Sequence, residues 1–290
     1  MNLIALIIGL ALERSLTRWL HLRELAWLDD WFGRGARWIR SAPGMAGTWI
    51  ALVVMLLPVV PVAWVAWAFR DVLFGFAYLA FAAVVLFFSL GPYDLMAQLK
   101  DWLEAHERGE PETADEIADA IRRSDQRPGP EPTVWALESA IFVQANHRIF
   151  GVIFWFMLLG PAGAWAYRVS DLFRRYMRVT GTGGRATELV EALFGLAAWI
   201  PARLLALSYA VSGSFDDAFE DWRAYYQRTS AGFFSVGENI LSAAGIGAIR
   251  RRCPEGDPQS SVRAAYQLLR RTVLIWITVI AALTLVGWAT

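Results

Sequence analysis

The sequence predicts an all-α multipass membrane protein with four to five transmembrane helices and additional interfacial and cytoplasmic helices. The chain of 290 residues is 56% hydrophobic and 19% charged, whereas about a quarter of the residues in a soluble domain are charged. Its apolar residues also gather in runs of roughly 20 residues, the length that a helix needs to cross a ~30 Å hydrocarbon core. No strand pattern of any length is present in the sequence.

We interpret the chain as a single membrane domain over residues 1–290. Its expected parts are a transmembrane hairpin at 48–90, a polar helical loop at 91–148, a transmembrane helix at 149–167, a transmembrane or re-entrant helix at 189–211, and a transmembrane helix at 272–288. The alternative for each run is a buried helix of a soluble protein, which several such runs in one chain disfavour.

The first two runs are separated only by Arg70 and Asp71, so we expect a tight helical hairpin. Pro58 and Pro61 interrupt the first run and predict a kink there, because proline has no backbone N–H to donate. The apolar stretch that opens the chain has neither a basic residue before it nor a cleavage site after it. It predicts an interfacial helix rather than a cleaved signal peptide.

The run at 189–211 is ambiguous from sequence alone. It contains Glu191 and Arg203, and Pro201 interrupts it. A central arginine costs about 2.5–3.5 kcal/mol on membrane insertion scales, so the run either spans or dips in and returns while packed on other helices.

Arginine positions give the expected orientation, because short cytoplasmic loops carry the excess of basic residues. Arg34, Arg37 and Arg40 precede the first run and only Arg70 follows it, which places the N-terminal region and the 91–148 loop in the cytoplasm. After the third run the rule conflicts with this topology. The arginines that would then lie outside are Arg168, Arg174, Arg175, Arg178 and Arg185. The conflict disappears only if this segment packs against protein or the third run does not fully cross.

The polar loop contains two helical patterns. Leu95, Leu99, Trp102 and Leu103 form one apolar stripe, so this helix is expected to cover an apolar surface. Thr113 followed three residues later by a glutamate predicts a capping box at the start of the next helix.

Polar residues directly before the third run form the candidate site. Glu138 and Asn146 are about two helical turns apart and are expected on one side of a helix, followed by His147 and Arg148. Polar groups at a membrane boundary are costly to desolvate, so they indicate an anion or amide site at the membrane face. The alternative is an interfacial helix end with snorkelling charges.

Other chemistry is less well supported. The formal net charge is zero and predicts no nucleic-acid partner. The single cysteine excludes an internal disulfide, and the three histidines lack a ligand spacing, so no cofactor is expected and a metal site stays unknown. Carboxylates that could bind Mg²⁺, or merely form a solvated face, are Asp171, Asp216, Asp217, Glu220 and Asp221.

Several motifs resemble a known family. In order, they are ALES with a later NHR, then GPAGAWAYR, then WIPARLLALSYAVSG, then AAGIGAI and a final hydrophobic helix. This pattern resembles the AmpE branch of the CobD/CbiB-like membrane family over nearly the whole chain. The resemblance implies a bacterial inner-membrane modulator of β-lactamase induction, linked to cell-wall recycling through a protein partner.

The enzymes of the wider family join an aminopropanol group to a corrinoid carboxylate with ATP and Mg²⁺. This chain departs from their pattern where the acids should be: His147 follows the asparagine, RVSDLF retains only Asp171, and Val190 and Glu191 replace paired acids. Loss of acidic groups removes metal ligands, so corrinoid ligation is not expected.

The leading hypothesis is therefore a regulator without catalytic residues, in contact with the lipid bilayer, that binds a small anionic or amide-bearing ligand. The expected ligand-binding residues are Glu138, Asn146, His147, Arg148, Tyr167, Asp171 and Arg203. The alternatives are an Mg²⁺- and nucleotide-dependent amide ligase and a plain assembly partner in the membrane.

Overall fold

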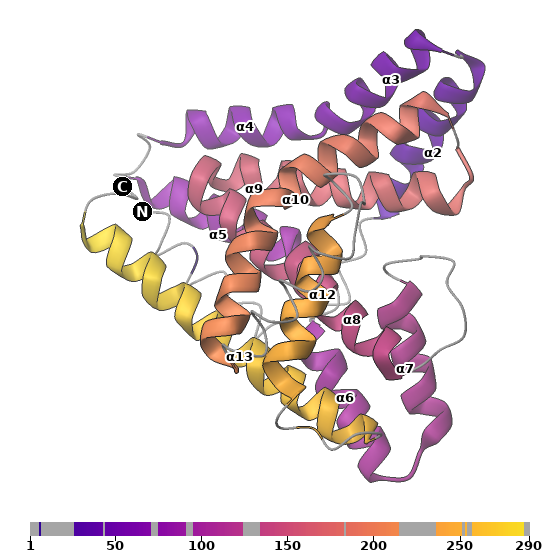
Figure 1. Ribbon diagram of the computed structural model, residues 1–290. Coiled ribbons are helices and arrows are strands. Elements are labelled where there is room, and N and C mark those ends of the chain that lie inside the picture. Colours follow the sequence, from indigo (N-terminus) through magenta and orange to yellow (C-terminus); the bar gives the residue numbers. More distant parts are fainter. Residues whose placement is uncertain are drawn as a thin grey trace. The chain divides into compact units, whose positions relative to one another are not determined.

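The computed structural model describes residues 6, 26–42, 44–70, 75–90, 95–123, 134–182, 184–214, 236–250, 253 and 257–286. Helices make up 91% of these residues and no strand occurs among them, which confirms the all-α class. The helices drawn in Figure 1 are α2 (Ala26–Ser41), α3 (Met45–Leu56), α4 (Val59–Ala68), α5 (Phe76–Ser89), α6 (Leu95–Glu107), α7 (Pro111–Arg123), α8 (Val134–Ala145), the π-helix η3 (Asn146–Phe150), α9 (Gly151–Val179), α10 (Arg185–Ser212), α12 (Val236–Ile249) and α13 (Pro258–Leu285). The predicted interfacial helix lies outside the described residues, except for Leu6.

Four helical segments are long and apolar enough to cross a membrane, as judged by length and composition. They are Met45–Ala68, Leu137–Val179, Arg185–Ser212 and Pro258–Leu285. The predicted second run appears as α5, a shorter apolar helix of 14 residues. The protein is therefore a multipass membrane protein.

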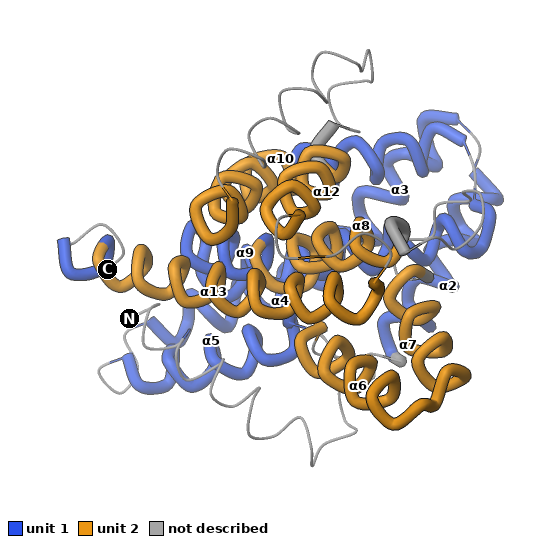
Figure 2. The backbone as a smooth tube through the Cα atoms, turned by 60° about the horizontal axis from the view of Figure 1, so that its bottom comes forward, with its two compact units in different colours: residues 1–92, 151–197, 283–290 blue, residues 93–150, 198–282 orange. Residues whose placement is uncertain are grey.

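The chain divides into two compact units, coloured separately in Figure 2. Unit 1 comprises residues 1–92, 151–197 and 283–290, and unit 2 comprises residues 93–150 and 198–282. Each unit has its own apolar core.

In unit 1, tryptophans compensate for the prolines that interrupt the apolar helices. Pro58 separates α3 from α4 as the kink prediction requires, and it cannot donate to the Val54 carbonyl one turn earlier. The indole of Trp31 on α2 donates to that carbonyl instead, at 2.9 Å. In α10, Pro201 likewise cannot donate to the carbonyl of Ala197 one turn earlier, and the indole of Trp155 donates to that carbonyl at 3.0 Å.

The third apolar run is not one straight helix, because α9 reverses direction at Gly160. Gly160 has φ 70° and ψ −157°, a conformation that glycine tolerates, and proline follows it. A Cβ placed on Gly151 would lie 2.5 Å from the ring of Tyr167. In a straight helix these two residues would be about 24 Å apart along the axis. Residues 151–159 and 161–179 therefore form two antiparallel legs, and α4 and α5 both pack against α9.

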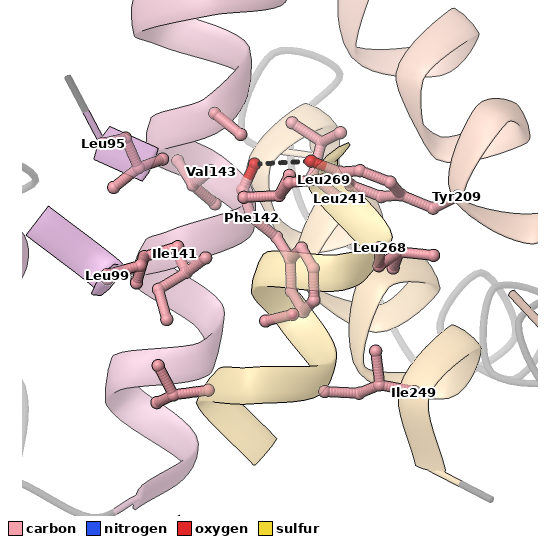
Figure 3. Packing of buried hydrophobic residues seen from close by; sticks show 14 of the residues in the cluster. Leu95, Leu99, Ile141, Phe142, Val143, Tyr209, Leu241, Ile249, Leu268 and Leu269 are labelled. Carbon is pink, nitrogen blue, oxygen red and sulfur yellow. Dashed lines mark hydrogen bonds between the residues drawn. The ribbon is translucent and has the colours of Figure 1, made fainter. Parts of the chain in front are cut away.

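In unit 2 the core forms around Phe142 of α8 (Figure 3). Its ring lies 5.1 Å from that of Tyr209 on α10, and its carbonyl accepts a hydrogen bond from the Tyr209 hydroxyl at 3.4 Å. A Cβ on Gly245 would lie 2.4 Å from the Phe142 ring, so α12 can approach α8 only because this residue has no side chain.

The helices α6 and α7 form an amphipathic hairpin that covers the unit 2 core. The predicted stripe is confirmed, since Leu95, Leu99 and Trp102 are buried and Leu103 packs against them. The predicted capping box is wrong, because α7 already begins at Pro111. Proline is favoured at the first position of a helix, where its missing N–H would have no helical acceptor.

We expect Trp31→Phe to lower the free energy of unfolding by about 1–3 kcal/mol, because it leaves the Val54 carbonyl without its donor. In a Pro58→Ala background the restored backbone N–H supplies that carbonyl, and the same change should cost much less. Thermal unfolding in detergent measures both values. Trp49→Phe, on a tryptophan that is 65% exposed, is the matched control. Equal costs in the two backgrounds would contradict the role given to Trp31.

Candidate functional site

Most of the residues expected to bind a ligand fall into two largely buried polar groups, one in each unit. The first, called the π-helix cluster, consists of Asn146, His147 and Arg148 in unit 2. The second, called the Asp171 cluster, consists of Arg168, Asp171, Arg174 and Arg175 in unit 1.

The π-helix cluster is built on an irregular turn of helix. The segment Asn146–Phe150 is π-helical and lies between α8 and α9. A π-turn accommodates one extra residue and redirects the side chains around it, and such turns occur frequently at functional sites. Asn146, His147 and Phe150 are almost fully buried there, so these residues do not form an exposed, snorkelling helix end.

Arg148 is held by neutral amides. Its Nε donates to Gln144 Oε1 at 3.0 Å and its Nη1 donates to Gln98 Oε1 at 3.0 Å. Gln98 lies on α6, so this guanidinium connects the α6–α7 hairpin to the π-helix. The arginine is 7% exposed, and its first role is therefore to fix the position of the turn.

His147 faces a carboxylate that the sequence did not single out. Its Nε2 lies 3.6 Å from Oε1 of Glu238 on α12, which is longer than a hydrogen bond but close enough for an ion pair when the imidazole is protonated. His147 is 1% exposed. No spacing or motif relates these two residues in the sequence, because only packing of α12 on α8 brings them together.

Asn146 is the most informative member of the cluster. It is 1% exposed, and among the residues that the structure describes neither its amide nitrogen nor its amide oxygen has a hydrogen-bond partner. A buried polar group left unpaired costs about 1–3 kcal/mol, so such groups are rare in native proteins and need an explanation. An amide that is satisfied only when a ligand binds is one such explanation.

The two other unit 2 residues lie in separate surroundings. Glu138 is 5% exposed and is hydrogen-bonded to Ser261 on α13. It lies two helical turns before Asn146, about 12 Å along the axis. Arg203 on α10 stacks over the Trp199 ring at 3.9 Å and donates to the Trp199 carbonyl at 3.2 Å, both within its own helix.

In unit 1, Asp171 is fully buried and surrounded by guanidinium groups. Arg168, Arg174 and Arg175 approach its carboxylate at 3.5, 3.1 and 2.8 Å. The three arginines are three or four residues from Asp171 on one helix, the spacing at which helical side chains meet. A second acid, Glu191 on α10, pairs with Arg178 and lies 4.0 Å from Arg174.

Tyr167 belongs to the surroundings of the Asp171 cluster. It is 2% exposed, and its ring packs 5.2 Å from that of Phe194. The guanidinium of Arg174 stacks over the same phenylalanine ring, 4.1 Å from its centroid. The structure therefore brings Tyr167 near the residues around Asp171, and separately brings Asn146 together with His147 and Arg148.

Asp171, the one proposed magnesium ligand that lies among the described residues, is engaged by arginines. Across those residues, no group of three or more His, Cys, Asp or Glu side chains is arranged to hold a metal ion. The carboxylate of Asp171 is already occupied by three cationic groups, which would repel Mg²⁺. The other proposed ligands, Asp216, Asp217, Glu220 and Asp221, lie outside the described residues.

Sequence reasoning missed Gln98, Gln144, Ser261, Glu238 and the arginine partners of Asp171. Gln144 and the arginines carry a usable signal, because they lie three or four residues from their partners on a helix. Gln98, Ser261 and Glu238 lie on other helices, and no spacing in the sequence relates them to their partners.

Comparison with known proteins agrees with the motifs. A relative named cobalamin biosynthesis protein CobD, from Stutzerimonas stutzeri (strain A1501), is 27% identical over 203 residues, which cover 67% of this chain and 62% of the relative. A protein of the same name from Chromobacterium violaceum is 25% identical over 225 residues, which cover 72% of this chain and 67% of that protein. The chain thus spans less than two thirds of the length of the first relative. No solved structure gives a significant match.

The family comparison covers almost the whole chain. The model of the family described as regulatory signalling modulator protein AmpE matches residues 1–289. The chain therefore belongs to the AmpE family.

Proposed function

We propose that this protein is an inner-membrane regulator that binds a small amide- or carboxyl-bearing ligand at the π-helix cluster and modulates β-lactamase induction and cell-wall recycling signalling. Membership of a family of regulatory signalling modulators supports the regulatory role. The link to β-lactamase follows from the family resemblance.

The unpaired amide of Asn146 is the observation that carries the ligand proposal. A side-chain amide offers two donors and one acceptor, and a peptide bond or a carboxyl group complements them. His147 and Glu238 beside it add a donor and a charged acceptor. Peptide-bearing cell-wall fragments carry the groups that such a site would bind.

The remaining residues take supporting roles in this proposal. Arg148 holds the π-turn through Gln98 and Gln144. Glu138 provides a second acidic position two turns away, and Arg203 a cationic one. Tyr167 and Asp171 would transmit the bound state through α9, whose chain continues directly from the π-helix.

An amide ligase dependent on Mg²⁺ and a nucleotide is the second candidate. Its support is the similarity to the two proteins named for cobalamin biosynthesis. The occupied carboxylate of Asp171 counts against it, because phosphoryl chemistry needs metal ions to neutralise phosphate charge.

We expect Asn146→Leu to retain or raise the melting temperature, because it removes a buried unpaired amide worth about 1–3 kcal/mol. The same variant should lose binding of a peptide-bearing cell-wall fragment in calorimetry and lose modulation of an inducible β-lactamase reporter. Arg148→Leu is the contrasting control, since it should lower the melting temperature by removing two buried hydrogen bonds. Normal signalling by a well-folded Asn146→Leu protein would rule out the proposed site.

We expect Asp171→Asn to lower the free energy of unfolding by about 3–5 kcal/mol, because it leaves buried guanidinium groups without their carboxylate. Asp101→Asn, at an exposed acid of α6, is the control and should change stability little. Purified wild-type protein should not hydrolyse MgATP in the presence of a carboxylate substrate. Hydrolysis that Asp171→Asn abolishes without loss of stability would favour the ligase instead.

A further inference from the structure

The length of the uncharged segment between Arg148 and Arg168 and the arginines that follow it predict different membrane topologies. Its length, 149–167, is that of a transmembrane helix, yet a crossing there would place the following arginines on the side opposite to the 91–148 loop. The reversal of α9 removes this conflict.

Each leg of the reversed helix is too short in its uncharged part to cross a bilayer. The uncharged parts are residues 149–159 and 161–167, which extend about 16 Å and 10 Å against a hydrocarbon thickness of ~30 Å. The contact between Gly151 and Tyr167 shows that the two legs begin and end side by side.

The tip of this hairpin has the character of a membrane-inserted reversal. Leu158 and Leu159 are 61% and 60% exposed at its end, although most neighbouring residues are buried. Non-helical backbone is tolerated at membrane depth only where protein covers it. Gly160 meets this condition, because it is buried and the Tyr78 hydroxyl of α5 lies against it.

A contact at the far end of α9 fixes the side to which the chain returns. Arg40 of α2 donates to the Thr182 hydroxyl at 3.3 Å, and the Phe32 and Phe173 rings pack at 5.1 Å. The helix α2 precedes the first candidate span, Met45–Ala68, so Arg40 lies on the side from which that span starts. Thr182 therefore lies on this side too. Because the sequence predicts that the 48–90 hairpin returns the chain to the side of α2, a complete crossing by 149–167 would place Thr182 on the opposite side.

We propose that residues 149–167 form a re-entrant hairpin that enters and leaves the membrane through one face. The side chains of Leu158 and Leu159 contact the acyl chains of the bilayer. The arginines after the hairpin return to the face that holds α2, on which the arginine distribution also predicts the 91–148 loop, so the whole set obeys the positive-inside rule. This topology is independent of the ligand that the protein binds.

Cysteine accessibility tests the proposal, because Cys253 is the only native cysteine and Cys253→Ser gives a thiol-free background. Single cysteines are placed at the exposed positions Arg37, Asp115 and Arg185, and at Leu158. A charged maleimide that does not cross membranes is applied to spheroplasts and, separately, to inverted inner-membrane vesicles. Co-elution with wild-type protein in detergent checks the folding of each variant.

We expect Arg37→Cys, Asp115→Cys and Arg185→Cys to be labelled in the same one of the two preparations. Leu158→Cys should not be labelled in either preparation and should react only after detergent solubilisation. Labelling of Arg185→Cys from the side opposite to Asp115→Cys would overturn the proposal. Labelling of Leu158→Cys from the opposite side in intact membranes would overturn it as well, because the hairpin would then cross completely.

Discussion

The structure depends on replacing the backbone hydrogen bonds that are lost where its apolar helices are interrupted. An unpaired carbonyl in an apolar environment costs enough to unfold a marginally stable membrane helix. Indole donors from Trp31 and Trp155 supply the carbonyls that proline leaves free in two different helices, and Tyr78 covers the reversal at Gly160. The two indole donors satisfy the carbonyls at the proline interruptions, and unit 1 is assembled around those interruptions.

The same requirement separates structural polar groups from functional ones. Arg148 and Asp171 are buried but extensively hydrogen-bonded, so each has a sufficient structural role. Asn146 is equally buried and has no hydrogen-bond partner among the described residues. The proposed ligand site therefore rests on the free-energy cost of burying the Asn146 amide without a hydrogen bond from the described residues. This amide lies in a π-turn, which already departs from regular helix.

Much of the architecture was accessible from sequence because it depends on local composition and period. The apolar runs, the kink near Pro58 and the buried stripe that includes Leu99 each follow from residues close together in the chain. The arginine distribution also identified the region where the simplest topology fails. One of the two explanations for this failure was that the third run does not fully cross the membrane. Only the positive φ of Gly160, however, shows where the chain turns back.

The sequence alone determined the helical class, the membrane environment and the family, because these depend on composition, periodicity and motif order. Tertiary structure decided which polar residues are paired. The partners Gln98, Ser261 and Glu238 come from helices distant in the chain, and hydrophobic packing rather than spacing brings them to their positions. It likewise decided that Arg40 meets Thr182, since a reversal in the middle of an apolar helix leaves no periodic signal in the residues that form it.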